Sequence, residues 1–203
     1  MIKFLGPWFC LFWIVTANAG DCLEYKNIPR IIINVPDWEK TVVQPIQPLN
    51  LYHGNVVATL VENLEIITDV KKIDDGFCVA LKTVNAEIGY NQFDVQIDIR
   101  HKPNSCQYNA VLEHEDKHID TYLKVVENHK VDLHKAVYTA ADSVMPVFVK
   151  SQDDVDVIVN QMHDSIIMHP DFVLIKQKIH AAEEIENKQV DVLETGADLK
   201  KCG

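Results

Sequence analysis

The chain has 203 residues, of which 47% are hydrophobic and 24% are charged, and its formal net charge is −11. This length is enough for one domain that buries a useful core. Because acidic groups are in excess, the chain lacks the net positive charge that attracts a polyanion. We therefore expect neither DNA nor RNA as a partner.

The first residues have the pattern of a secretory signal peptide. Lys3 precedes an almost unbroken apolar run over residues 4–15, and residues 16–19 have the small-x-small form that signal peptidase accepts. The run is shorter than the roughly 20 apolar residues that cross a bilayer. The sequence therefore predicts a removable signal peptide at residues 1–19, an exported periplasmic or extracellular protein, and no membrane span in the mature chain.

Four cysteines follow the predicted signal peptide, at Cys22, Cys78, Cys106 and Cys202. An even number of cysteines in an exported chain predicts two disulfides. Three pairings are possible, and we favour Cys78 with Cys106 and Cys22 with Cys202, the second of which would close the two ends of the mature chain. A four-cysteine zinc site is disfavoured because the chain has no C-x-x-C pair.

Residues 20–105 have the pattern of strands and turns. Apolar, β-branched runs occur at residues 31–35, 56–67 and 77–84, and the turn dipeptide Asp75-Gly76 precedes the last of them. Residues 93–99 alternate between apolar and polar, which is typical of a strand with one buried and one solvated face. This part of the chain predicts a small antiparallel sheet.

Residues 106–203 have the period of helices. Apolar residues recur at spacings of three, four and seven from about residue 107 to 144, without glycine or proline. A second helical stretch begins after Ser151, a good N-cap, and Pro170 should break it near His169 before helix resumes over residues 171–194. The predicted fold class is α+β, with residues 20–203 as a single domain.

The first predicted helix carries the motif His114-Glu115-Asp116-Lys117-His118. Histidines at positions i and i+4 lie one turn apart on the same side of a helix, so both imidazoles can reach one zinc ion. A glutamate directly after the first histidine can take a proton from the water that such a metal binds. The motif therefore predicts His114 and His118 as ligands of Zn2+ and Glu115 as the general base, the alternative being a chance match in a chain with 9 histidines.

An alternating strand at residues 93–99, followed by this motif on a long helix, resembles the active-site half of the zincin metallopeptidases. The chain is also loosely similar to small bacterial secreted HExxH proteins of poorly defined function. The resemblance implies a zincin-like fold, with a gluzincin-like third ligand, a glutamate from a second helix. It also implies that residues 93–99 border the cleft and pair with an extended peptide substrate by β-addition.

The third ligand is not marked by the motif itself. The metzincin pattern would need glycine and histidine where this chain has Thr121 and Lys124. If the two long helices form an antiparallel hairpin that reverses near Val149, residues 180–184 lie level with residues 118–114. The ligand is therefore expected in the second helix.

Within that helix, we favour Glu186 as the ligand. It falls inside the apolar stripe of the helical wheel, where a carboxylate needs a partner such as zinc. The stripe consists of Ile175, Ile179, Ala182, Val190 and Leu193. Glu183, His180 and Asp191 are the alternatives, and all of these carboxylates would be solvated if the helix bound no metal.

These features together predict an exported zinc-dependent hydrolase, a metallopeptidase that acts on a peptide or protein substrate. Two other classes of protein fit the same sequence. A non-catalytic zinc-binding protein of the cell envelope would keep the histidines and tolerate loss of Glu115. A disulfide-bonded interaction protein would bind no stoichiometric metal.

Overall fold

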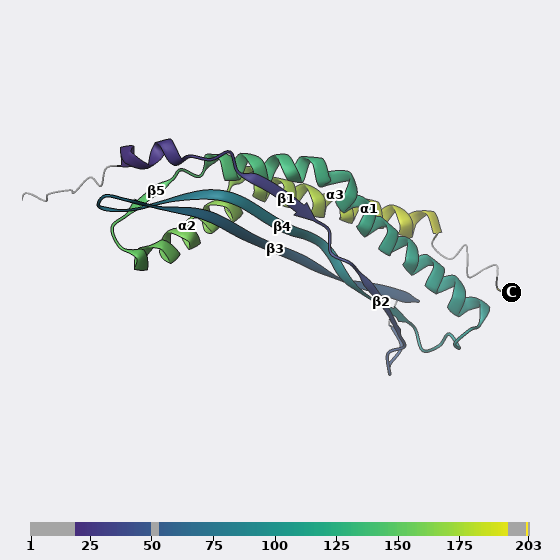
Figure 1. Cartoon of the computed structure of the whole chain (residues 1–203). Coiled ribbons are helices and arrows are strands. Elements are labelled where there is room, and N and C mark those ends of the chain that lie inside the picture. Colours follow the sequence, from purple (N-terminus) through teal and green to yellow (C-terminus); the bar gives the residue numbers. More distant parts are fainter. Residues whose placement is uncertain (1–18, 50–52, 195–201, 203) are drawn as a thin grey trace, which may run out of the picture.

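The computed structural model describes residues 19–49, 53–194 and 202 (Figure 1). The predicted signal peptide lies outside these residues, except for Ala19, where the first element begins. Within the described residues, no helix has the length and apolar character needed to cross a membrane. In chain order the elements are η1 (Ala19–Tyr25), β1 (Arg30–Asn34), β2 (Glu39–Val43), β3 (Gly54–Ile73), β4 (Gly76–Ile97), α1 (Cys106–Ser143), β5 (Val147–Val149), η2 (Gln152–Asp154), α2 (Val155–Ile167) and α3 (Pro170–Glu194).

β4 is the central strand of a mixed five-stranded sheet. It pairs antiparallel with β3 over the whole length of both strands and with β5 near the hairpin turn. On the edge opposite β3, β1 and β2 pair with it in parallel. The α+β class is confirmed, but the prediction of an antiparallel sheet was wrong for β1 and β2. β3 runs opposite to β4 on one of its edges, whereas β1 and β2 run in the direction of β4 on the other.

Two bulges shift the side-chain alternation along β4. The pairing with β3 slips where Lys82 and Asn91 have no opposite residue, and both side chains are exposed. Each extra residue reverses the alternation, because successive side chains of a strand point to opposite faces. Apolar side chains in all three sections of β4 are thereby buried, among them Val79, Val84 and Phe93.

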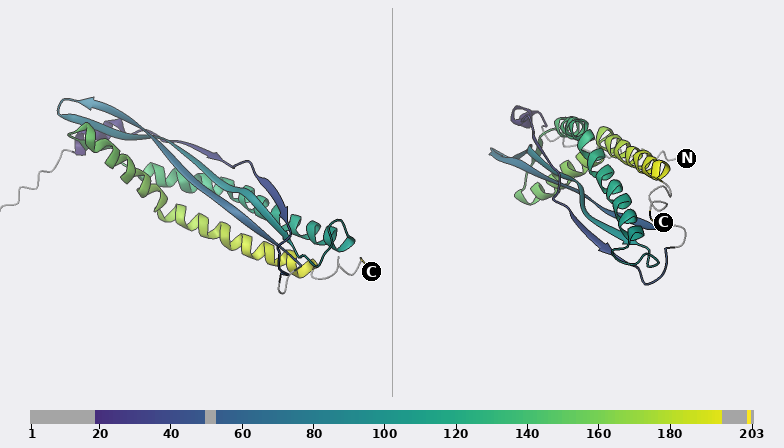
Figure 2. Two further views of the ribbon diagram at one scale, coloured as in Figure 1. Left: turned by 90° about the horizontal axis from the view of Figure 1, so that it is seen from below. Right: turned by 90° about the vertical axis from the view of Figure 1, so that its right-hand side faces the viewer.

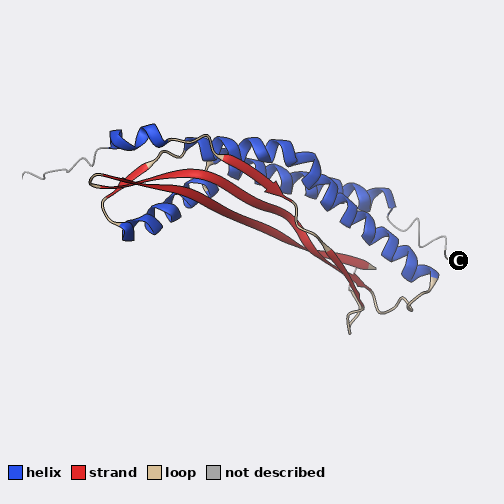
Figure 3. Ribbon diagram, in the orientation of Figure 1, coloured by secondary structure: helices blue, strands red, loops and turns tan. Residues whose placement is uncertain are grey.

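The helices lie along one face of the sheet (Figures 2 and 3). α1 starts after Ser105, whose hydroxyl accepts the N–H of Tyr108 at 3.2 Å, and it runs over nearly the predicted range. The expected break is also present, because α2 ends at Ile167 and α3 begins at Pro170. Proline suits this first position of a helix, where its missing N–H is not needed.

The main core lies between this helical layer and the sheet. Its buried members come from the middle of β4, the second half of α1, the end of α2 and the first half of α3. On α3, the buried apolar residues are Phe172, Ile175 and Ile179. Apolar packing therefore holds the first half of α3 against α1 and the sheet.

Both disulfides differ from the pairing that we favoured. Cys22 is bonded to Cys78 and Cys106 to Cys202. The molecule is elongated, with η1 beside the hairpin turn at one end and the start of α1 near the end of α3 at the other (Figure 1). The predicted Cys22–Cys202 bond was wrong because these two cysteines lie at opposite ends of the molecule, and each disulfide instead joins neighbours at one end.

Candidate metal centre

The two histidines of the motif meet an aspartate from α3. His114 Nε2 and His118 Nε2 are 3.2 Å apart, and Asp191 Oδ1 lies 3.4 Å from the first and 3.2 Å from the second. The histidine side chains are 22% and 12% exposed, whereas that of Asp191 is 63% exposed. The three donor atoms thus form a nearly equilateral triangle that is shielded on the histidine side and open to solvent on the aspartate side.

The size of the triangle fits a tetrahedral cation. Metal–ligand bonds of about 2.0–2.1 Å at tetrahedral angles place two ligand atoms about 3.3 Å apart, and the three edges are 3.2, 3.2 and 3.4 Å. Two imidazoles and a carboxylate are also the kinds of donor that such a cation takes. Three protein ligands are typical of sites that keep one position for water or substrate, whereas structural sites have four.

Glu186, the residue we favoured as third ligand, is exposed and is not one of these three. Asp191, one of the alternatives, meets the two histidines instead. The hairpin assumed from the sequence placed the partners of His114 and His118 about two turns too early in α3. The chain between α1 and α3 forms β5, η2 and α2 rather than a tight reversal. As a result, His118 lies level with Asn187, where residues near 180 were expected.

The other two alternatives lie beside each other, away from the triangle. Glu183 is 5% exposed, and its Oε2 is 3.2 Å from Nδ1 of His180, whose side chain is 58% exposed. Burial and the neighbouring Glu183 carboxylate raise the pKa of Tyr90 above its usual range. Glu183 is therefore a buried carboxylate of the α3–sheet contact, and the ring of His180 reaches it from the surface.

Glu115 is buried against the sheet, outside the ligand group. It is 4% exposed, and its Oε1 lies against the Cα of Gly54 at the start of β3. Burial, together with the charges of Asp191 and Asp116, raises the pKa of Glu115 to about 7. A bound cation would lower this pKa again, because a positive charge favours the carboxylate. The glutamate directly follows His114 in the sequence, and its carboxylate is held by contacts with the start of β3 rather than within the candidate ligand group.

Gly54→Ala should destabilise the protein by about 1–3 kcal/mol, the usual cost of overpacking. An added Cβ would overlap Glu115 Oε1 and lie 2.6 Å from Val111 Cγ1. Urea unfolding followed by tryptophan fluorescence measures the loss. Asn55→Ala, at the neighbouring exposed position, is the matched control and should change the free energy of unfolding by less than about 0.5 kcal/mol. An unchanged stability for Gly54→Ala would contradict the packing of Glu115 against β3.

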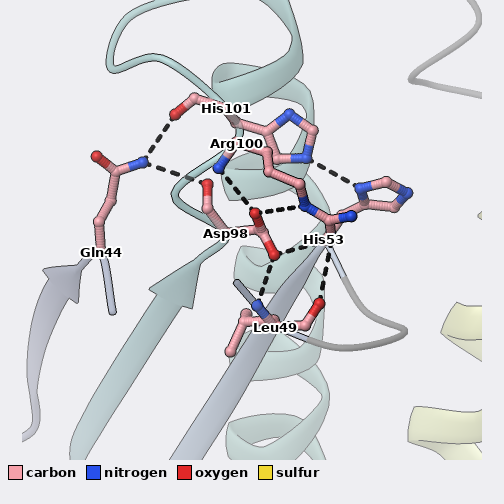
Figure 4. Close-up of polar contacts among 6 residues, drawn as sticks. All are labelled: Gln44, Leu49, His53, Asp98, Arg100 and His101. Carbon is pink, nitrogen blue, oxygen red and sulfur yellow. Dashed lines mark hydrogen bonds and ion pairs between the residues drawn. The ribbon is translucent and has the colours of Figure 1, made fainter. Parts of the chain in front are cut away.

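A buried aspartate, Asp98, forms hydrogen bonds with Leu49 and His53, which precede β3 in the sequence (Figure 4). Asp98 Oδ2 accepts the N–H of Leu49 at 2.6 Å, and Oδ1 accepts Nε of Arg100 at 2.8 Å. The backbone N–H of Asp98 donates to His53 O at 2.8 Å. The hydrogen bonds from Arg100 hold the pKa of Asp98 well below its usual range. These hydrogen bonds fix Leu49 and His53 and so set the start of β3 beside Glu115.

The strand that we expected to receive a substrate is already paired on both edges. Residues 93–96 of β4 pair with residues 40–43 of β2 on one side and with the first part of β3 on the other. The predicted β-addition to residues 93–99 is therefore wrong. Among the described residues, β3 pairs with β4 alone, and its first residue, Gly54, touches Glu115. The middle of β3 is covered, since His163 Nε2 lies 3.2 Å from Leu64 O.

Asn187 is a functional candidate that the sequence pattern did not indicate. Its Oδ1 is 2.8 Å from Nδ1 of His118. The only signal in the sequence is its spacing of four residues from Asp191, which is informative only once Asp191 is known to face α1.

Comparison with known proteins gives no relative from which a function could be transferred. No family model matches the chain, and neither a curated protein nor a solved structure matches it. The chemistry of the side chains at the α1–α3 contact therefore carries the functional argument.

Proposed function

We propose that the protein is an exported zinc-dependent hydrolase, a metallopeptidase of zincin type, with His114, His118 and Asp191 as the zinc ligands. The observation that carries the proposal is the triangle of donor atoms, whose edges of 3.2–3.4 Å match tetrahedral coordination. Zinc is the cation that most commonly combines imidazole and carboxylate ligands with a tetrahedral geometry. The two disulfides agree with an exported protein, because such bonds persist in oxidising compartments.

Each residue has a separate role in this proposal. Zinc in the triangle supplies a Lewis acid that acidifies water and polarises a carbonyl group. His114 and His118 would hold the zinc through Nε2, and Asp191 would hold it through Oδ1 from the solvent side. Glu115 accepts a proton from the attacking water and returns it to the leaving amine. Its burial against Gly54 restricts the carboxylate and keeps it beside the ligands.

The first part of β3 is the proposed place for an extended peptide substrate. Only one of its edges is paired among the described residues, and backbone groups on the other edge can hydrogen-bond an added strand. Gly54 lies against Glu115, so a peptide on this section passes the general base. An unfolded polypeptide such as denatured casein is therefore the appropriate first substrate.

Zinc affinity in ligand variants tests the ligand set. Wild-type protein should bind about one zinc per chain, and Asp191→Asn should weaken binding by more than about 100-fold, beyond the usual effect of a second-shell change. Glu186→Gln is the matched control on the same helix and should bind as the wild type does. Competition with a chromophoric chelator gives the affinities. Equal weakening in Glu186→Gln, or full affinity in Asp191→Asn, would contradict the assignment.

Metal content and hydrolysis together separate the three classes of protein. One zinc per chain with casein cleavage supports the peptidase. One zinc per chain without cleavage of casein or a peptide library indicates the non-catalytic zinc-binding protein. A chain that takes up no zinc even when the metal is supplied refutes the proposal and leaves the disulfide-bonded interaction protein.

A further inference from the structure

Asn187 lies on α3 one turn before Asp191 and contacts a ligand of the candidate site. Its Oδ1 is 2.8 Å from Nδ1 of His118, and its Nδ2 donates to the backbone oxygen of Glu183 at 2.9 Å. The second contact fixes the amide, because only the NH2 group can donate to a carbonyl oxygen. The oxygen of the amide must then face His118.

An acceptor at this position determines which nitrogen of His118 carries hydrogen. A neutral imidazole has one N–H and one lone pair, so a hydrogen bond to Asn187 Oδ1 requires the hydrogen on Nδ1. The lone pair is then on Nε2, the atom 3.2 Å from both His114 Nε2 and Asp191 Oδ1. Partners of this kind fix the orientation and basicity of metal-bound histidines in general.

We propose that Asn187 is a positioning residue that holds His118 as the Nδ1–H tautomer and directs the lone pair of Nε2 toward the metal position. The inference rests on the proposed zinc site for its consequence, but the tautomer is a property of the protein alone. Residues 183, 187 and 191 are four apart and therefore share one side of α3. Successive turns of this helix thus supply the backbone oxygen of Glu183 that fixes the amide, the amide of Asn187, and Asp191 as the third ligand.

The tautomer is measured directly by two-dimensional NMR of the 15N-labelled imidazoles, on metal-free protein at about pH 8, above the pKa of unperturbed imidazole. Wild-type protein should show His118 with hydrogen on Nδ1. Asn187→Leu should lose this signature and weaken zinc binding by about 10–100-fold. Asn187→Asp keeps an acceptor, so it should retain the Nδ1–H tautomer and at least the wild-type affinity. Lys188→Leu makes the same apolar change at the next, exposed position and should alter neither measurement.

Two results would overturn the inference: an Nε2–H tautomer in the wild type, or wild-type zinc affinity in Asn187→Leu. If Asn187→Leu does not fold, Asn187→Ala removes the acceptor without adding an apolar group. A wild type that binds no zinc refutes the proposed function, yet an Nδ1–H tautomer that is lost in Asn187→Leu still supports the positioning role. The two proposals can therefore fail independently.

Discussion

Glu115→Gln should slow hydrolysis by several orders of magnitude while the protein still binds zinc. The amide has the shape of the carboxylate but cannot take a proton, and loss of a general base lowers a rate by about 10²–10⁴-fold. Zinc should remain because the three donor atoms come from His114, His118 and Asp191. The measurements are kcat/KM on a peptide substrate and zinc content per chain.

Glu113→Gln is the matched control for this experiment, because it makes the same change two residues earlier on an exposed position of α1. It should leave both rate and zinc content unchanged. A Glu115→Gln protein with wild-type activity would contradict the role of general base. If this variant instead lost its zinc, Glu115 would have to be a ligand, against the geometry of the triangle.

Removing the Cys106–Cys202 disulfide should cost about 4.7 kcal/mol of stability, from the loop-closure entropy of its 96-residue separation. The same estimate for Cys22–Cys78, with a separation of 56 residues, is about 4.2 kcal/mol. Either loss is comparable to the whole stability of an ordinary domain. Denaturant unfolding of Cys106→Ser/Cys202→Ser and of Cys22→Ser/Cys78→Ser, each compared with the wild type, measures both effects.

The mismatched variant Cys22→Ser/Cys202→Ser distinguishes this pairing from the one that the sequence favoured. It removes one partner from each observed disulfide, so it should be less stable than either matched double variant. Non-reducing peptide mapping gives a second test. A peptide that links Cys22 to Cys202 would contradict the structure.

The helical half of the molecule was largely predictable from local sequence. The absence of glycine and proline over residues 107–144 predicted nearly the range of α1, and Pro170 predicted the break before α3. Both signals act within one helix, through its period and through the loss of a backbone N–H at proline. The positions of His114 and His118 on one side of α1 follow from the same local geometry.

The sheet was less predictable because its order depends on contacts distant in sequence. The 22-residue strand β4 looked like two strands, and the bulge at Asn91, which shifts the alternation, lies between them. Its central place, with β1 and β2 parallel on one edge and β3 antiparallel on the other, depends on pairings between residues far apart in the sequence. No local pattern of these strands specifies which strands become neighbours.

The sequence by itself determined the HExxH motif, the helix that carries it and the place of Glu115 directly after the first histidine. Only the tertiary structure decided that Asp191 rather than Glu186 meets the histidines and that Asn187 contacts His118. It also decided that one disulfide lies at each end of the molecule. The physical reason is that the second half of α3 faces α1 with polar residues, so its hydrophobic pattern does not mark the contact. The register between the helices is set instead by the path through β5 and α2 and by the packing of Phe172, Ile175 and Ile179.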